Sequence, residues 1–177
     1  MRLIPGEPEA ITYDSVAGIK ADASAVIVGR IGSVSAGPDF QDQYGNTTHL
    51  ATIMIDIEEV LKGPVVEADP GRLKLWTVAG VGTGEFPNEG GAERLASALP
   101  RERAVFFTVN MAELVEQLGG PADVPQADPE AYEVLGGNGF IREVDGAAEP
   151  PAWVSAGWPA EFRGRRFDEV VDEIKGS

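Results

Sequence analysis

Residues 23–34 read ASAVIVGRIGSV and residues 52–63 read TIMIDIEEVLKG, and these two stretches decide the fold class. In the second stretch Ile53, Ile55 and Ile57 alternate with Thr, Met, Asp and Glu. Successive side chains of a β-strand point to opposite faces, so this alternation is typical of an antiparallel strand with one buried face. The three isoleucines are therefore expected to face a core.

The first stretch is apolar on both faces. Its centre, Ala25–Ile31, is interrupted only by Gly29 and Arg30, which predicts a buried central strand. Further strands are predicted at residues 72–78, 104–109, 132–135 and 140–144, and helices at 13–21, 92–99, 111–118 and 166–175. Turn-rich or glycine-rich loops are expected at 35–48 and 80–91, and Asn138-Gly139 predicts a hairpin between the last two strands.

These elements predict a mainly β fold, an antiparallel barrel or tight sandwich of five to six strands with short N-terminal and C-terminal helices. The first helix is expected to begin at Asp14 or Ser15, which suit an N-cap. The last helix carries apolar residues at the i, i+3, i+4 and i+7 spacing of one buried face: Phe167, Val170, Val171 and Ile174. Residues 1–177 are expected to form a single domain, with 1–12 as a loose arm.

The composition excludes several kinds of site and partner. The chain has no cysteine, which rules out disulfides, thiolate metal sites and cysteine nucleophiles. Its formal net charge is −15, and residues 104–141 hold six acidic side chains and no Lys or Arg. Nucleic-acid affinity depends on neutralising phosphates with Lys and Arg, so no nucleic-acid partner is expected.

The sequence leaves the compartment open. No apolar run approaches the length of about 18 residues that indicates a membrane-spanning helix. The first residues contain no stretch long enough for a signal peptide. We therefore expect an extracellular or cell-surface location if a signal peptide has been removed, and a cytoplasmic one otherwise.

Three short motifs carry a family resemblance. They are Val28-Gly29-Arg30-Ile31 in the first strand, Ile57–Gly63 at the end of the second, and Val105-Phe106-Phe107 in a later one. With these motifs, the layout of residues 14–146 resembles small OB-like or netrin-like β-barrel domains of bacterial secreted proteins and lipoproteins, many of them actinobacterial. The resemblance implies an OB-like barrel of bacterial origin, and it implies no catalytic residue.

Candidate chemical sites are few. His49 has no neighbouring nucleophile and is expected at the surface, since a catalytic histidine needs a nucleophile and an acid around it. Asp39, Asp42 and Asn46 form an oxygen-rich loop without the spacing of an EF-hand, so a turn is favoured over a calcium site. The glycines of residues 80–84 lack the lysine of a phosphate loop and predict a mobile loop. No catalytic residue, metal site or cofactor is predicted.

Trp153 and Trp158, in PPAWVSAGWP, are the candidate binding residues. Tryptophan offers a large rigid contact surface, and flanking prolines keep the segment stiff, which suits contact with a partner. The competing interpretation is that both indoles plug one end of the barrel. Residues 163–166 form the only basic cluster and are expected to make local ion pairs with the acidic surface.

The leading hypothesis is a non-enzymatic binding or protein-interaction domain whose partner is another protein. Two alternatives stay open. One is a small enzyme with acidic catalytic residues, which would need a pocket holding two or more carboxylates. The other is an acidic inhibitor that mimics nucleic acid, which would need a strip of acids spaced like phosphates. The oligomeric state is not indicated.

Binding to DNA or RNA should be undetectable at physiological salt. The net charge of −15 repels a phosphate backbone, and the sequence holds no basic stripe that would release counterions. A gel-shift titration with duplex DNA and with single-stranded RNA checks this. A tight shift that weakens as salt rises would contradict it.

Overall fold

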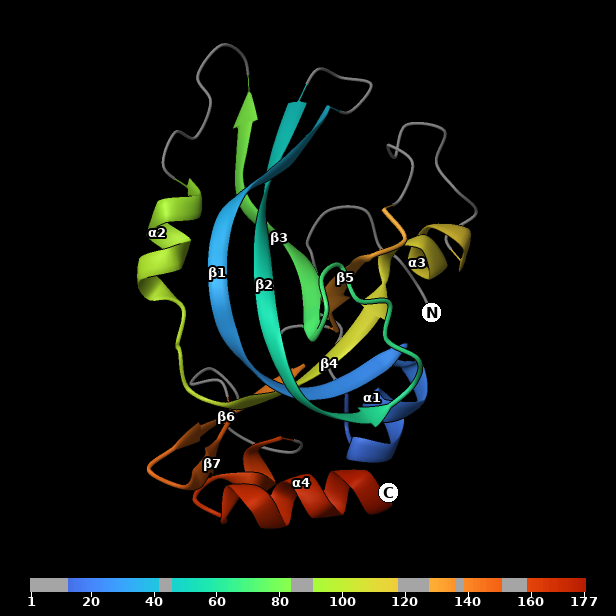
Figure 1. Ribbon diagram of the computed structural model, residues 1–177, viewed down its shortest axis with the longest axis vertical. Coiled ribbons are helices and arrows are strands. Elements are labelled where there is room, and N and C mark those ends of the chain that lie inside the picture. The colour runs from blue at the N-terminus through green and yellow to red at the C-terminus, as the bar shows by residue number, and fades with distance from the viewer. Residues whose placement is uncertain (1–12, 42–45, 84–90, 118–127, 136–138, 151–158) are drawn as a thin grey trace.

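The computed structural model describes residues 13–41, 46–83, 91–117, 128–135, 139–150 and 159–177 (Figure 1). Within these ranges the protein is mainly β, as the sequence predicts. The strands are β1 (Ala25–Gln41), β2 (Asn46–Lys62), β3 (Arg72–Thr83), β4 (Ala104–Asn110), β5 (Ala131–Val134), β6 (Phe140–Val144) and β7 (Ala147–Glu149). The helices are α1 (Val16–Asp22), α2 (Gly91–Ala98), α3 (Met111–Gln117), the 3-10 turn η1 (Ala160–Phe162) and α4 (Phe167–Gly176).

Five of the strands form a closed ring. Neighbours follow the order β1-β2-β3-β5-β4, and β1 also pairs with β4, while β6 and β7 extend the sheet beyond the ring. All these pairs are antiparallel except β3–β5, which is parallel. The described sheet is thus a mixed one of seven strands, and the prediction of five to six antiparallel strands is wrong in number. The sequence did not predict β7, because a strand of three residues is too short to show the alternation of apolar and polar side chains.

β5 and β6 do not form the hairpin that Asn138-Gly139 predicts. One edge of β4 is occupied by β1, which pairs along residues 104–108. β5 and β6 share the other edge end to end, β5 on residues 108–110 and β6 on residues 104–106. β5 and β6 therefore follow one another along the same edge of β4 instead of pairing with each other. Residues 136–138, which lie between them in the sequence, are outside the described ranges.

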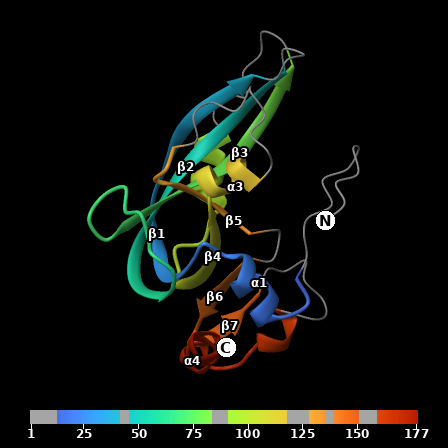
Figure 2. The same cartoon turned by 90° about the vertical axis from the view of Figure 1, so that its right-hand side faces the viewer.

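The strands β1, β2 and β3 are longer than predicted and project from the rest of the molecule as a ribbon (Figures 1 and 2). Much of the expected loop at 35–48 is strand, and so are the glycine-rich residues 80–83. The β1–β2 register shifts between Ala36 and Asp39, which accommodates the intervening Gly-Pro as an irregularity within the strand. Proline is tolerated there because β1 pairs with β4 only up to Gly29, which leaves one strand edge without a partner strand.

Two hydrophobic cores lie on the two faces of the ring of strands, one inside the ring and one outside it. The inner core gathers side chains from all five ring strands, and the outer core lies between the ring and helices α1 and α4. Every residue of β4 is buried, and the side chains of residues 104–107 enter the two cores in turn. Val105 and Phe107 belong to the outer core, whereas Ala104 and Phe106 belong to the inner core.

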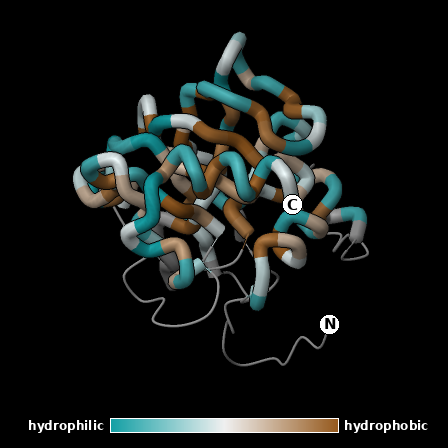
Figure 3. Tube along the Cα trace, turned by 90° about the horizontal axis from the view of Figure 1, so that it is seen from below, coloured by the Kyte–Doolittle hydropathy of each residue, from teal (hydrophilic) through white to brown (hydrophobic). Residues whose placement is uncertain are grey.

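The two terminal helices begin and pack as their sequences predict. The Oγ of Ser15 accepts a hydrogen bond from the backbone N–H of Gly18 at 3.1 Å, so Ser15 is the N-cap of α1. In α4 the four apolar residues at helical spacing are all buried. Seen from below, hydrophilic and hydrophobic segments alternate along this helix (Figure 3).

A lysine joins the C-terminal ends of these helices. Lys20, in the last turn of α1, donates from Nζ to the backbone oxygens of Ile174 and Ser177, each at 2.6 Å. A cation there satisfies carbonyls that the helix leaves without partners and complements the helix dipole. None of the described helices has the length and hydropathy needed to cross a membrane.

Ile55→Ala should destabilise the protein by about 2–4 kcal/mol, because it leaves a cavity in a close-packed core. Ile55 is fully buried and Ile53 is 5% exposed, as the β2 alternation predicts, whereas Ile57 is only partly buried. Met54→Ala is the matched control, because Met54 is the partly exposed neighbour on the other face, and it should cost less than about 1 kcal/mol. Urea unfolding of both variants measures the difference, and equal costs would contradict the strand register.

Candidate binding cavity

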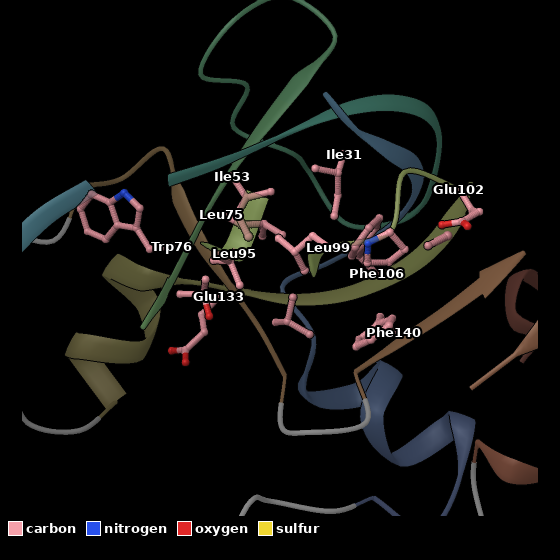
Figure 4. Close-up of a pocket in the computed structure, with 14 residues that line it drawn as sticks. Ile31, Ile53, Leu75, Trp76, Leu95, Leu99, Glu102, Phe106, Glu133 and Phe140 are labelled. Atoms are coloured by element: carbon pink, nitrogen blue, oxygen red, sulfur yellow. The ribbon is translucent and has the colours of Figure 1, made fainter. Parts of the chain in front are cut away.

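A cavity of about 400 Å³ lies in the inner core beside helix α2 (Figure 4). Strand residues of the inner core form a large part of its wall, namely Ile31, Ile53, Leu75, Phe106, Val134 and Phe140. Leu95 and Leu99, from α2 and the residue that follows it, close another side. The wall is therefore largely apolar, and it is assembled from both the ring and the helix.

Local rules of strand and helix geometry place these side chains together. Leu95 and Leu99 are four residues apart, which sets them on one face of a helical turn, and the Leu99 N–H donates to the Leu95 carbonyl at 2.9 Å. Ile53 and Leu75 are direct partners across β2 and β3, so their side chains share one face. At a fifth position, Ala104 of β4 presents only a methyl group to the cavity, which leaves room there.

Among the described residues that line the cavity, two carry a charge, the carboxylates of Glu102 and Glu133. Figure 4 shows them at opposite ends of the lining, with Glu133 on the same side as Trp76. A projection can shorten a separation but cannot lengthen it, so the two carboxylates do not converge on one point. Acid–base catalysis by a carboxylate pair requires both groups within reach of the same reacting bond.

Glu133 has an altered protonation equilibrium. Glu133 is solvent-exposed on β5, and partial desolvation of its side chain by the neighbouring chain raises the pKa of its carboxyl above the ordinary value of 4.5. Desolvation disfavours the ionised form, and no cation among the described residues pairs with this carboxylate to offset it. The ionised Glu133 side chain is therefore a group whose charge the protein itself leaves uncompensated.

The sequence-predicted sites lie elsewhere. Trp153 and Trp158 fall outside the described residues, so their role in binding stays a prediction. His49 lies on the projecting ribbon, where its Nδ1 is 2.8 Å from Oδ1 of Asp39, and neither residue lines the cavity. Asp42 also falls outside the described residues. Within the part of the chain that the structure describes, no three His, Cys, Asp or Glu side chains are grouped to hold a metal ion.

The basic cluster forms the ion pairs that the sequence predicts. Its three arginines each pair with a nearby carboxylate: Arg163 with Glu149 at 3.7 Å, Arg165 with Glu173 at 2.7 Å, and Arg166 with Glu169 at 3.6 Å. All three pairs are partly or largely solvent-exposed, and such pairs contribute little to stability. The cluster therefore serves local charge balance.

The residues that form the cavity were not identified from the sequence. The i, i+4 spacing of Leu95 and Leu99 in the predicted helix at 92–99 was a visible sign of an apolar face. No feature of the neighbouring sequence identified Glu133 or Trp76 as cavity residues. An acidic residue in a strand, such as Glu133, is most often solvated. No protein-family model matches the chain, and no curated protein matches it significantly. The evidence for function therefore comes from the cavity.

Glu133→Gln should stabilise the protein at neutral pH and lose this effect in acid. Because the pKa of Glu133 is raised on folding, the folded protein holds this proton more tightly than the unfolded chain. Its stability therefore falls as pH rises from the ordinary value of 4.5 through the raised pKa. Glutamine removes that loss, so the variant should melt above the wild type at pH 7 and together with it at low pH.

Glu161→Gln is the matched control for this comparison. Glu161 is exposed on η1 and lies outside the cavity wall, and its replacement changes the net charge of −15 by the same amount. It therefore reports how far relief of general self-repulsion raises the melting temperature. An equal gain in both variants at pH 7 would show that the surroundings of Glu133 have no special effect.

Proposed function

We propose that the protein is a non-enzymatic binding domain that receives an apolar group in the cavity beside α2. The observation that supports this most directly is the cavity itself, about 400 Å³ in volume and walled by aliphatic and aromatic side chains. Small-molecule sites are typically concave and mostly apolar, with volumes of about 300–1,000 Å³ and a few polar groups for orientation. Thr77, Glu102 and Glu133 are the polar groups of this kind here.

We also propose that the five-stranded ring is an OB-like barrel. Support comes from its closure through the β1–β4 pair, its largely antiparallel pairing and the filling of its interior by side chains. A partly open five-stranded barrel is the architecture of that class, whose members use one barrel face and the adjoining loops for binding. The likeness concerns architecture, and function is argued from the cavity alone.

The alternative of a small acid–base enzyme has less support. The cavity wall does hold two carboxylates, but Glu102 and Glu133 stand at opposite ends of it (Figure 4). The wall contains neither histidine nor cysteine that would act as a nucleophile or a base. An apolar cavity with two separated acids suits binding and orientation better than proton transfer.

The alternative of an acidic mimic of nucleic acid also has less support. A mimic needs carboxylates that are free to meet a basic partner. Several acids of this surface are already paired inside the molecule: Glu58 contacts Arg30 and Arg103, each at 2.8 Å, and Asp128 contacts Lys74 at 2.6 Å. These internal pairs reduce the negative charge that the surface offers to a partner.

The wild-type protein should bind N-phenyl-1-naphthylamine, a neutral dye that fluoresces in apolar sites, with a saturable signal. Leu99→Trp should weaken that binding by at least about tenfold, equivalent to about 1.4 kcal/mol, because the larger ring fills the cavity. Ala98→Trp is the matched control, since Ala98 is exposed and outside the wall, and it should bind the dye as the wild type does. Dye titration at equal protein concentration measures all three.

Melting curves of the same proteins separate blocked binding from misfolding. Both tryptophan variants should unfold cooperatively. Dye binding of wild-type strength in folded Leu99→Trp, or absence of saturable binding by the wild type, would contradict the proposed function.

A further inference from the structure

We propose that the ligand of the cavity is an uncharged small molecule, an apolar body with one hydroxyl or carbonyl group, and that this group forms a hydrogen bond with the hydroxyl of Thr77. This inference rests on the proposed function, because it names the ligand class for the same cavity. It excludes amphiphiles with a carboxylate or an ammonium group as preferred ligands.

The apolar surface that such a ligand would cover belongs to the inner core. Five buried residues of this core line the cavity, and each keeps a small exposed fraction: Ile31 8%, Ile53 5%, Leu75 2%, Ala104 3% and Phe106 6%. Ile27, Ile55 and Leu73 belong to the same core but do not line the cavity, and they are fully buried. The surface that these core residues still expose therefore coincides with the cavity wall, and covering it with a ligand removes apolar surface from water.

A negatively charged group has no partner in this wall. The described residues that line the cavity include no lysine, arginine or histidine. Arg101 is next in sequence to the lining residue Glu102, but its Nη1 already donates to the carbonyls of Ile31 and Gly32, each at 3.1 Å. Burying an ionised group without a partner is costly, because an apolar wall does not replace the water that the group loses. Ligands with a carboxylate are therefore disfavoured.

The acidic residues of the wall do not create a site for a cation. Glu133 lies between Tyr132 and Val134, which both pack into the inner core, so strand alternation directs its side chain to the opposite face. Both Glu133 and Glu102 are exposed to solvent. Attraction between exposed charges is weak, since water and salt screen it. An ammonium group would therefore lose its hydration in the cavity without gaining a buried partner there.

Among the described polar residues of the wall, Thr77 is the one that the strand register directs inward. In the pairing of β2 with β3, Thr77 aligns with Ala51, and Leu75 aligns with Ile53. Residues two apart on a strand share a face, so Thr77 lies on the same face as Leu75, and its partner Ala51 is fully buried. Trp76, between them in sequence, lies on the other face. The register therefore places the Thr77 side chain on the cavity face of β3.

The hydroxyl of Thr77 is available to a ligand. It makes no hydrogen bond with any of the described residues, and the residue is only partly buried. A hydroxyl donates one hydrogen bond and accepts others, so it matches an uncharged hydroxyl or carbonyl group. Leaving such a group unpaired in apolar surroundings is costly, so the hydrogen bond would orient the ligand. The apolar body would supply the affinity.

The test is displacement of the bound naphthylamine dye at pH 7 by four molecules that share one butylphenyl body: 4-butylphenol, 4-butyltoluene, 4-butylbenzoate and 4-butylbenzylammonium. The first two are uncharged, the third is an anion and the fourth is a cation. With wild-type protein, each uncharged molecule should displace the dye at a concentration about tenfold or more below that of either charged molecule, because the wall offers a buried charge no partner.

Thr77→Val tests the hydroxyl, because valine keeps the branched shape of threonine and lacks its hydrogen-bonding group. The variant should need at least about threefold more 4-butylphenol than the wild type to displace the dye, as expected for the loss of one hydrogen bond. Displacement by 4-butyltoluene, which has no hydrogen-bonding group, should change by less than about twofold. That second result also shows that the cavity of the variant is intact.

Thr52→Val is the matched control. Thr52 aligns with Trp76 across the β2–β3 pair, so it lies on the outer face of the sheet, and it does not line the cavity. This variant should respond to all four molecules as the wild type does. Melting curves of both valine variants should show cooperative unfolding.

The outcomes distinguish this inference from the proposed function. If either charged molecule displaces the dye as readily as 4-butylphenol does, the assignment of an uncharged ligand is overturned while the apolar binding cavity stands. If the two valine variants respond alike to 4-butylphenol, or if Thr77→Val weakens 4-butyltoluene equally, the role of the Thr77 hydroxyl is overturned. If the dye itself does not bind, the proposed function fails together with this inference.

Discussion

The structure depends on the antiparallel pair of β1 and β4, which separates the two hydrophobic cores and is buried on both faces. In β1, alternate residues enter different cores, with Val26 and Val28 in the outer core and Ala25 and Ile27 in the inner core. The same pair closes the ring of strands. A slip of one residue in the pairing would move every side chain to the opposite core, so the two cores together fix the register. Gly29 shows how closely β1 is packed, because a Cβ at that position would lie 2.5 Å from the backbone oxygen of Asp56 on β2.

The sequence predicts the elements of this fold better than their partners. Period-two and helical spacing locate the strands that became β1 to β4 and the buried face of α4, because those signals are local to each segment. Pairing is not local. Asn138-Gly139 favours a hairpin by its own chemistry, yet β5 and β6 both occupy the one edge of β4 that β1 leaves available. The loop predicted at 35–48 fails for a related reason, since pairing with neighbouring strands outweighs the turn preference of its glycine and proline.

The cavity is even harder to predict from local sequence signals than the strand pairing is. Leu99 follows α2, Phe106 lies on β4 and Glu133 lies on β5, and only closure of the ring and docking of α2 bring them to one place. The tryptophans favoured from sequence, Trp153 and Trp158, were chosen for their residue type and flanking prolines, which are properties that need no fold. A binding site made of ordinary core residues has no distinctive residue type or flanking motif that would identify it in the sequence. Its one unusual feature is the raised pKa of the Glu133 carboxyl, and the desolvation that causes it depends on neighbours that the sequence alone does not identify.

The two cores differ in a way that connects the architecture to binding. In the outer core, large side chains such as Phe107, Phe162 and Phe167 are fully buried against α1 and α4. In the inner core, Ala104 presents a small side chain, and space remains between the ring and α2. Unfilled apolar space forgoes dispersion contacts that a close-packed interior would make. A ligand that fits this space would restore those contacts only in the folded state, so binding and folding stability are thermodynamically linked. The inner core is therefore both the centre of the ring and the place where the proposed ligand would add to the stability of the fold.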